Sequence, residues 1–338
     1  MKIGVIGDQH FKDSLSYSDY ISDHRLAEKE AVFSFIVDSF EDCDHVVLLG
    51  DNFNSKNNSS ETNREFVAFI ERFGNKKIYI ISGNHEKKGD GKTAIDFLGE
   101  VKKPNWFIYT GPGYETMGTL KASFLPFMLN SELKVETSEE ASRVMVEDLK
   151  GGDILFTHHS ITGTVFNGIK TDDLHEAVLS KEELEKKYKL VVAGHIHVPQ
   201  QIGNTLIAGS LFTSEVGETE KFIYKIADDF SIEKLKVPCR EIHKVFNPTT
   251  EQLLSIPKSA IVKVIITNKT VDIEKLKEQL SRFDASLIIE DYPDERVKAH
   301  IEEGAFDFNI ESLLKLYSDE KDVDYPKLLK GLEIITNG

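Results

Sequence analysis

Five short clusters of acid, amide and histidine residues occur along the chain, each directly after an apolar run. Asp8 and His10 follow the first run and are separated by one residue, so their side chains leave the strand in the same direction. Asp51 follows the second run behind Gly50, a residue type that lets the backbone turn sharply. A carboxylate at such a turn can bridge two cations, and we expect Asp51 to do so.

The remaining clusters add neutral oxygen and nitrogen donors. Asn84, in the sequence GNHE, offers a carbonyl oxygen that binds a cation without adding negative charge. The fourth run ends in His158 and His159, and the fifth is followed by GHIH, which contains His195 and His197. Imidazole nitrogens suit zinc, iron, manganese and related ions, so these clusters favour a transition-metal site.

The combination of these residues carries more weight than any one of them. A single aspartate at a strand end is commonly a turn or cap residue, and a single histidine is commonly a satisfied polar group. Oxygen and nitrogen donors in five strand-end loops, however, match what two octahedral ions about 3.5 Å apart require. The candidate ligands are Asp8, His10, Asp51, Asn84, His158, His195 and His197. The sequence therefore predicts a metal-dependent phosphoesterase.

Short β-branched runs alternate with amphipathic stretches up to about residue 225, a pattern typical of a layered α/β or α+β domain. The predicted strands are 2–7, 45–49, 77–81, 152–156 and 189–193. One helix is predicted at 26–40, and a second begins at a capping box formed by Thr62 and Glu65. Because loops converge where strands end, we expect the five polar clusters to meet.

The pattern changes after about residue 225. A hairpin is predicted at 221–227 and 231–237, and a strand, helix, strand pattern follows at 260–267, 272–283 and 286–290. This order favours a second, smaller domain. Two short amphipathic helices predicted after residue 306 either pack against that domain or dock on a partner.

Composition and charge limit the class of protein. The chain has 338 residues and a formal net charge of -16, which argues against holding nucleic acid by bulk electrostatics. A local basic edge is still compatible with that balance, although a solvated loop is the alternative interpretation of Lys56, Lys87, Lys88 and Lys92. No apolar stretch is long enough to cross a bilayer, and the first residues lack the features of a signal peptide. We therefore expect a cytoplasmic protein.

The order of the motifs resembles the calcineurin-like metallophosphoesterase superfamily: DxH, GDxxx, GNHE, a strand ending in histidine, and GHxH. The resemblance implies an α+β fold, a four-layer αββα sandwich, and two divalent cations. One ion would be held by Asp8, His10, Asp51 and His197. The other would be held by Asp51, Asn84, His158 and His195. His158 is preferred to His159 because the first histidine after the strand usually binds the metal in this family.

His85 is left over once the ligands implied by the resemblance are assigned. An imidazolium beside the cations can donate a proton to a departing alkoxide. We therefore interpret His85 as the general acid and as a contact to the transition state. The alternative is that His85 is only a structural neighbour of Asn84.

Features outside the metal motifs resemble SbcD-type DNA nucleases. The segment 207–214 with Glu218 lies soon after GHIH, as in that family, and Arg25, Glu28 and Phe33 match its first helix. The resemblance implies a nuclease domain at 1–237, a DNA-binding cap domain at 238–300 and a helical tail at 301–338 that docks on the coiled coil of an SbcC-type ABC ATPase. It also implies DNA as substrate, a homodimer formed through the phosphoesterase domain, and Mn²⁺ as the favoured ion. The compact length is similar to that of phage recombination nuclease subunits.

One position departs from the pattern of SbcD-type nucleases. Two other functions are alternatives to the nuclease assignment. Several SbcD-type nucleases carry a histidine or aspartate shortly after the GD motif, where this chain has Asn54, so a catalytic role there is in doubt. The main alternative is a small-molecule or cyclic-nucleotide phosphodiesterase of the same superfamily. A scaffold that kept the fold and lost the chemistry is the other, and the complete ligand set argues against it.

Overall fold

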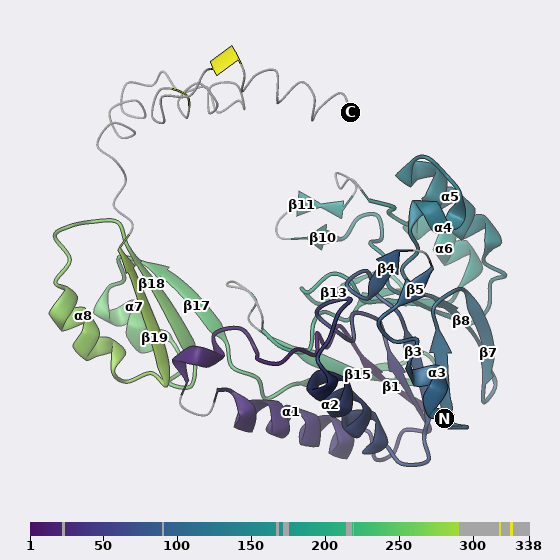
Figure 1. The fold of residues 1–338 in the computed structure, drawn as a ribbon, viewed down its shortest axis with the longest axis horizontal. Coiled ribbons are helices and arrows are strands. Elements are labelled where there is room, and N and C mark those ends of the chain that lie inside the picture. Colours follow the sequence, from purple (N-terminus) through teal and green to yellow (C-terminus); the bar gives the residue numbers. More distant parts are fainter. Residues whose placement is uncertain are drawn as a thin grey trace.

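Two six-stranded sheets form the centre of the protein (Figure 1). The computed structural model describes residues 1–21, 24–89, 91–166, 169–171, 176–213, 218, 220–290, 318, 325 and 326. In spatial order, the first sheet consists of β16 (Ile232–Lys236), β15 (Phe222–Ala227), β1 (Lys2–Ile6), β2 (His45–Leu48), β3 (Lys77–Ile81) and β6 (Trp106–Tyr109). The second consists of β13 (Gln200–Ile202), β14 (Thr205–Ile207), β12 (Leu190–Ala193), β9 (Ile154–Thr157), β8 (Leu120–Leu125) and β7 (Gly113–Met117).

Helices cover the outer faces of both sheets. The helices on the first sheet are α1 (Leu26–Ser39), α2 (Ser60–Glu71) and α3 (Leu98–Val101). Those on the second are α4 (Asn130–Leu133), α5 (Ser138–Asp148) and α6 (Lys181–Lys187). A separate apolar core fills the space between the two sheets. The layers run helix, sheet, sheet, helix, so the predicted four-layer α+β sandwich is confirmed.

Both faces of the central strands are buried, which explains why these strands are continuous apolar runs in the sequence. On β2 and the residue after it, Val46 and Leu48 pack toward the helices, whereas Val47 and Leu49 pack toward the second sheet. β1, β2, β3 and β6 are parallel, and so are β8, β9, β12 and β14. Their carboxyl ends therefore lie at one edge of each sheet, where the polar clusters follow.

The predicted central strands and the first helix are confirmed, with small differences at their ends. The start of α2 was predicted wrongly. Ser59 is its N-cap and accepts the backbone N–H of Thr62, so no capping box forms between Thr62 and Glu65. Glu65 instead pairs with Lys29 of α1 at 2.5 Å. Thr62 thus lies in the first turn of α2 and not at its N-cap, and the side chain of Glu65 is bound by a cation of the neighbouring helix.

A third sheet follows the hairpin of β15 and β16, which is the predicted one. It contains the parallel strands β17 (Ile242–Phe246), β18 (Ile261–Ile266) and β19 (Ala285–Glu290). α7 (Thr250–Ser255) and α8 (Ile273–Leu280) cover one face around a core of its own, at the left in Figure 1. The predicted strand, helix, strand pattern is confirmed, whereas β17 and α7 were not predicted.

The predicted domain boundary at 237/238 falls between β16 and β17. Residues 291–300 of the predicted cap domain, and the predicted tail at 301–338 apart from three residues, lie outside the described part of the chain. Shorter elements complete the description: β4 (Lys87–Gly89), β5 (Lys92–Thr93), β10 (Val165–Phe166), β11 (Ile169–Lys170) and the 3-10 helix at Ser18–Tyr20. Among the helices that the structure describes, none has the length and apolar character that a bilayer span requires.

A chain of ion pairs connects the sandwich to the third sheet. Arg25 is fully buried and donates to both carboxylate oxygens of Glu28, at 2.7 and 2.6 Å, and to the carbonyl oxygen of Ser16 at 2.7 Å. Glu28 also accepts the backbone N–H of Arg240 at 2.8 Å, and the guanidinium of Arg240 reaches Asp284 at 2.6 Å. Breaking a buried pair costs about 3–5 kcal/mol. The segment that leads into the third sheet is therefore held against the start of α1.

Candidate metal centre

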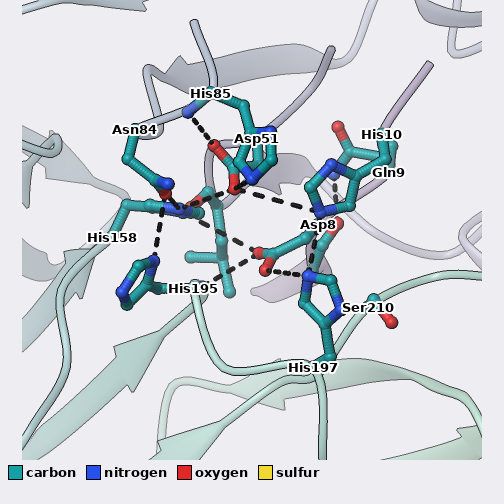
Figure 2. Close-up of polar contacts among 12 residues, drawn as sticks. Asp8, Gln9, His10, Asp51, Asn84, His85, His158, His195, His197 and Ser210 are labelled. Atoms are coloured by element: carbon teal, nitrogen blue, oxygen red, sulfur yellow. Dashed lines mark hydrogen bonds and ion pairs between the residues drawn. The ribbon is translucent and has the colours of Figure 1, made fainter. Parts of the chain in front are cut away.

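The seven predicted ligands lie together where strands of both sheets end (Figure 2). The first sheet contributes the residues after β1, β2 and β3, which are Asp8, His10, Asp51 and Asn84. The second contributes the residues after β9 and β12, which are His158, His195 and His197. In Figure 2, His10 and His197 lie on one side of the two carboxylates, and Asn84, His158 and His195 lie on the other.

Short distances join these side chains. Nε2 of His10 lies 2.9 Å from Nε2 of His197. Oδ1 of Asn84 lies 3.1 Å from Nε2 of His158 and 3.0 Å from Nδ1 of His195. Oδ2 of Asp51 lies 3.3 Å from Nε2 of His158 and 3.9 Å from Nε2 of His10. Asp51 therefore stands between the two halves of the cluster.

Three overlapping groups in the described residues have ligand atoms close enough to hold a metal ion, within 4.8 Å of one another. They are Asp8 with His10 and His197, Asp51 with His158 and His195, and His10 with Asp51 and His85. A further observation supports a cation: Oδ2 of Asp8 is buried and makes no hydrogen bond within the described residues. Two buried carboxylates surrounded by imidazole and amide donors form a ligand set that fits divalent transition-metal ions.

Glycines precede three of the ligands because the loops approach one another closely. A Cβ on Gly83 would lie 2.0 Å from Oδ1 of Asp51, and a Cβ on Gly194 would lie 2.5 Å from Oδ1 of Asp8. Gly50 has a φ of 97°, so the sharp turn predicted there is present. Any side chain at Gly83 or Gly194 would thus displace a ligand that comes from a different loop.

Three of the predicted ligands have a left-handed backbone. The φ angles are 47° at His10, 43° at Asp51 and 76° at His195. For residues other than glycine such a conformation costs on the order of 1–3 kcal/mol, and it persists where surrounding contacts over-determine it. Here the N–H of His10 donates to the carbonyl oxygen of Asp51 at 2.9 Å, and the N–H of His195 donates to Oδ1 of Asp8 at 3.1 Å. The ligand loops therefore constrain one another.

The neighbours His158 and His159 have different environments. Nδ1–H of His158 donates to the carbonyl oxygen of Leu49 at 2.6 Å, so Nε2 is the ring nitrogen that faces Asp51, at 3.3 Å. Nε2 of His159 instead accepts the N–H of Met128 at 3.2 Å, and its ring stacks on Phe127. Of the two histidines, only His158 lies among the predicted ligands in the described structure.

Burial and neighbouring charges raise the pKa of some residues in the cluster and lower the pKa of others. Burial raises the pKa of Asp8, and the nearby charge of Asp51 raises it further. Burial also opposes ionisation of Asp51, but His158 and His10 outweigh it and hold its pKa below the usual range. Burial lowers the pKa of His10 to about 3, whereas at His158 the charges of Asp51 and Asp8 overcome burial and raise the pKa to about 9. Of these two histidines, only His158 is thus stabilised in its charged form by the carboxylates.

His85 occupies the exposed rim of the cluster. Its side chain is 43% exposed, its backbone N–H donates to Oδ1 of Asp51 at 2.9 Å, and its Nε2 lies 3.9 Å from Oδ2 of Asp51. Nδ1–H donates to the carbonyl oxygen of Asn54 at 3.0 Å, so Nε2 is the ring nitrogen turned toward the ligands. Asn54 therefore contacts His85 through its backbone rather than its side chain.

Three carboxylates that support the cluster were not predicted for this purpose. Glu86 is buried and accepts the N–H groups of Gly83 at 2.7 Å and of Phe53 at 3.0 Å, so it ties together the loops after β2 and β3. Burial raises its pKa to about 7. Glu176 contacts His195, and Glu218 contacts His197. Glu86 stands in the GNHE motif and Glu218 in the segment similar to nucleases, but no sequence pattern marks Glu176.

The predicted basic edge is partly wrong. Lys87 is 8% exposed, and its ammonium pairs with both carboxylate oxygens of Glu132 at 3.0 Å, so it does not face solvent. Lys56, Lys88 and Lys92 are exposed and line one pocket. That pocket lies between the loop after β2 and the β4–β5 hairpin, which follow Asp51 and His85 in the chain. Three lysines therefore remain as the basic edge.

Comparison with known proteins agrees with this geometry. Residues 1–199 match the family described as calcineurin-like phosphoesterase, and the chain belongs to that family. It is accordingly a metal-dependent phosphoesterase, and its family uses divalent cations.

Solved structures similar to the chain include an archaeal phosphodiesterase, with 13% identity and a TM-score of 0.35 over 70% of this chain and 100% of the other. They also include single and double mutants of Vps29 from Entamoeba histolytica, each with 14% identity and a TM-score of 0.29 over 70% of this chain and 99% of the other. No curated protein matches the chain.

Proposed function

We propose that this protein is a two-metal nuclease that hydrolyses phosphodiester bonds in DNA, with Mn²⁺ as the favoured ion. The observation that carries the proposal is a lysine-lined pocket formed by segments that closely follow Asp51 and His85 in the chain. Lys56 follows Asp51 in the loop after β2, and Lys88 lies in β4, shortly after His85, so a phosphate chain bound by both lysines would pass over the segments that carry these two residues. A small ester needs no such extended contact.

We assign one ion to Asp8, His10, Asp51 and His197, and the other to Asp51, Asn84, His158 and His195. The division of the side chains around the two carboxylates and the central place of Asp51 support this assignment. Divalent cations at these positions would supply Lewis-acid stabilisation of the charge that develops on the phosphoryl oxygens.

His85 is assigned as the general acid. Its Nδ1–H is held by the carbonyl oxygen of Asn54, and its partly exposed ring leaves Nε2 accessible from the side where substrate would enter. A protonated Nε2 there can donate to the leaving alkoxide of the cleaved strand. The side chains of the cluster thus divide into those that hold cations and one that moves a proton.

The partner assignment rests on the resemblance of the chain's layout to SbcD-type nucleases. We propose that residues 301–338 dock on an SbcC-type ABC ATPase, that 238–300 contact DNA, and that the phosphoesterase domain forms a homodimer. Residues 301–338 lie almost wholly outside the described part of the chain. An ATPase would compensate for the modest affinity expected of an acidic protein with only a short basic edge.

The substrate class can be tested by comparing two esters. With Mn²⁺, the purified protein is expected to degrade linear duplex DNA as well as bis-p-nitrophenyl phosphate, and a chelator should stop both reactions. The products are measured on denaturing gels and by absorbance. Hydrolysis of the small ester alone, with and without an ATPase partner, would contradict the nuclease assignment and favour the small-molecule phosphodiesterase.

The role of the basic edge in DNA binding can be tested separately. Changing Lys56→Ala or Lys88→Ala should weaken binding to duplex DNA and reduce the slope of log affinity against log salt by about 0.9 for each DNA phosphate that the variant no longer neutralises. Hydrolysis of bis-p-nitrophenyl phosphate should be unaffected. Lys186→Ala is a matched control, because this exposed lysine lies on α6 in the opposite helical layer. Equal salt slopes for all three variants and the wild type would place the DNA path elsewhere.

A further inference from the structure

Two carboxylates from outside the ligand motifs contact the two histidines of GHIH. Nε2 of His195 lies 3.0 and 3.1 Å from the carboxylate oxygens of Glu176. Nδ1 of His197 lies 3.1 Å from Oε1 of Glu218. A neutral imidazole carries one N–H and one lone pair, and a carboxylate accepts only an N–H. Each carboxylate therefore selects the ring nitrogen that keeps the proton, and the other nitrogen presents its lone pair.

The nitrogen left with a lone pair faces the ligand cluster in both cases. For His195 it is Nδ1, which lies 3.0 Å from Oδ1 of Asn84; because that amide oxygen is itself an acceptor, the two lone pairs converge where a cation would bind. For His197 it is Nε2, which lies 2.9 Å from Nε2 of His10. The two histidines, which are separated by a single residue, thus use opposite ring nitrogens. The residue between them, Ile196, is fully buried in the core of the second sheet, which anchors the loop.

Glu176 and Glu218 differ in the other side chains that they contact. Glu218 forms a buried ion pair with Lys221 at 2.8 Å, and Lys221 is 1% exposed. Any substitution of Glu218 would disturb this pair and the fold around it. Glu176 accepts a hydrogen bond from Ser160, and its side chain is 28% exposed. Replacing Glu176 therefore changes the environment of His195 without removing a partner from a buried lysine.

We propose that Glu176 is a positioning residue that fixes the tautomer and the ring orientation of His195. The proposal deepens the function given above and rests on its assignment of His195 as a ligand of the second ion. Without Glu176, His195 can place its proton on Nδ1 and donate to Asn84, and this tautomer has no lone pair on the cluster side. The expected consequence is selective, because the ion assigned to Asp8, His10, Asp51 and His197 does not involve His195.

The first test measures metal binding rather than activity. Isothermal titration of the metal-free protein with Mn²⁺ should resolve two ions in the wild type. In Glu176→Ala the affinity for one of them should fall about 10–100-fold, with the other unchanged. Glu182→Ala is the matched control, since this exposed glutamate on α6 lies away from the histidines. Two ions bound with wild-type affinities by Glu176→Ala would overturn the proposal and leave the two-metal function standing.

The second test needs no metal. The ¹⁵N resonances of the histidine rings in the metal-free wild type should show His195 protonated at Nε2, assigned by comparison with His195→Gln. In Glu176→Ala the proton should shift in part to Nδ1, while His158 keeps its Nδ1–H because Leu49 still accepts it. A wild-type His195 already protonated at Nδ1 would overturn the positioning proposal. If instead the tautomers are as expected but no Mn²⁺ binds, the positioning role holds and the proposed function fails.

Discussion

Replacing Asp51 with alanine is expected to abolish hydrolysis and to lower the metal content of the purified protein from two ions toward none. Asp51 is 1% exposed and is the ligand shared by both proposed ions, with its carboxylate near His158 and His10. Losing a bridging anion removes several kcal/mol of transition-state stabilisation, which corresponds to roughly a 10³-fold loss of kcat. Elemental analysis and steady-state kinetics on bis-p-nitrophenyl phosphate measure the two effects.

Asp38→Ala is a suitable control for this experiment, because Asp38 is an exposed aspartate on α1, away from the cluster. Circular dichroism would show that both variants fold. Binding of Mn²⁺ should raise the Tm of the wild type and of the control, since a ligand that binds only the folded state stabilises it. It should leave the Tm of Asp51→Ala almost unchanged. Two tightly bound ions in Asp51→Ala would show that Asp51 is not the bridge.

Replacing His85 with alanine is expected to reduce cleavage of DNA by about 10²–10⁴-fold while both ions stay bound, because general acid catalysis contributes roughly that factor. His85 donates Nδ1–H to Asn54 and turns Nε2 toward the site, an arrangement suited to proton donation. The reduction should be much smaller for bis-p-nitrophenyl phosphate, since p-nitrophenolate leaves without needing a proton. Comparing kcat for the two substrates separates proton transfer from other effects.

The same variant decides between two roles for His85. His85 also belongs to a group with His10 and Asp51 that is close enough to hold a metal ion. If it were a ligand, His85→Ala would bind less metal and would be equally impaired on both esters. His243→Ala is the control, because His243 is a partly buried histidine paired with Glu241 in the third sheet. Wild-type cleavage of DNA by His85→Ala would contradict both roles.

The position of the ligand cluster could be predicted because its signals are local. Each ligand directly follows an apolar run, and strands buried on both faces produce such runs. The strands before Asp8, Asp51 and Asn84 are parallel neighbours, so their ends meet without any long-range information from the side chains. The same reasoning applies to His158 and His195 after β9 and β12.

Most of the predictions that failed depended on a partner far away in the chain. Lys87 lies in an apparent run of lysines, but Glu132 pairs with it from 45 residues away. The capping box of Thr62 and Glu65 failed for a local reason, because Ser59 caps α2 and Thr62 lies inside the helix, although Glu65 also pairs with Lys29. β17 was not predicted because only its first residue, Ile242, is buried, and its pairing with the neighbouring β18 stabilises it. At Lys87 and in β17 a tertiary contact decides what the local pattern does not show.

The donors of the metal centre, their order, and the layered fold that carries them are determined by the sequence, because residue type and strand periodicity are local properties. Which nitrogen of each histidine faces the cluster is decided only by the tertiary structure. Glu176, Glu218 and the carbonyl oxygen of Leu49 select those nitrogens, and they come from 19, 21 and 109 residues away from His195, His197 and His158. A hydrogen bond to one side of an imidazole determines the chemistry on its other side, and only folding brings these partners within about 3 Å.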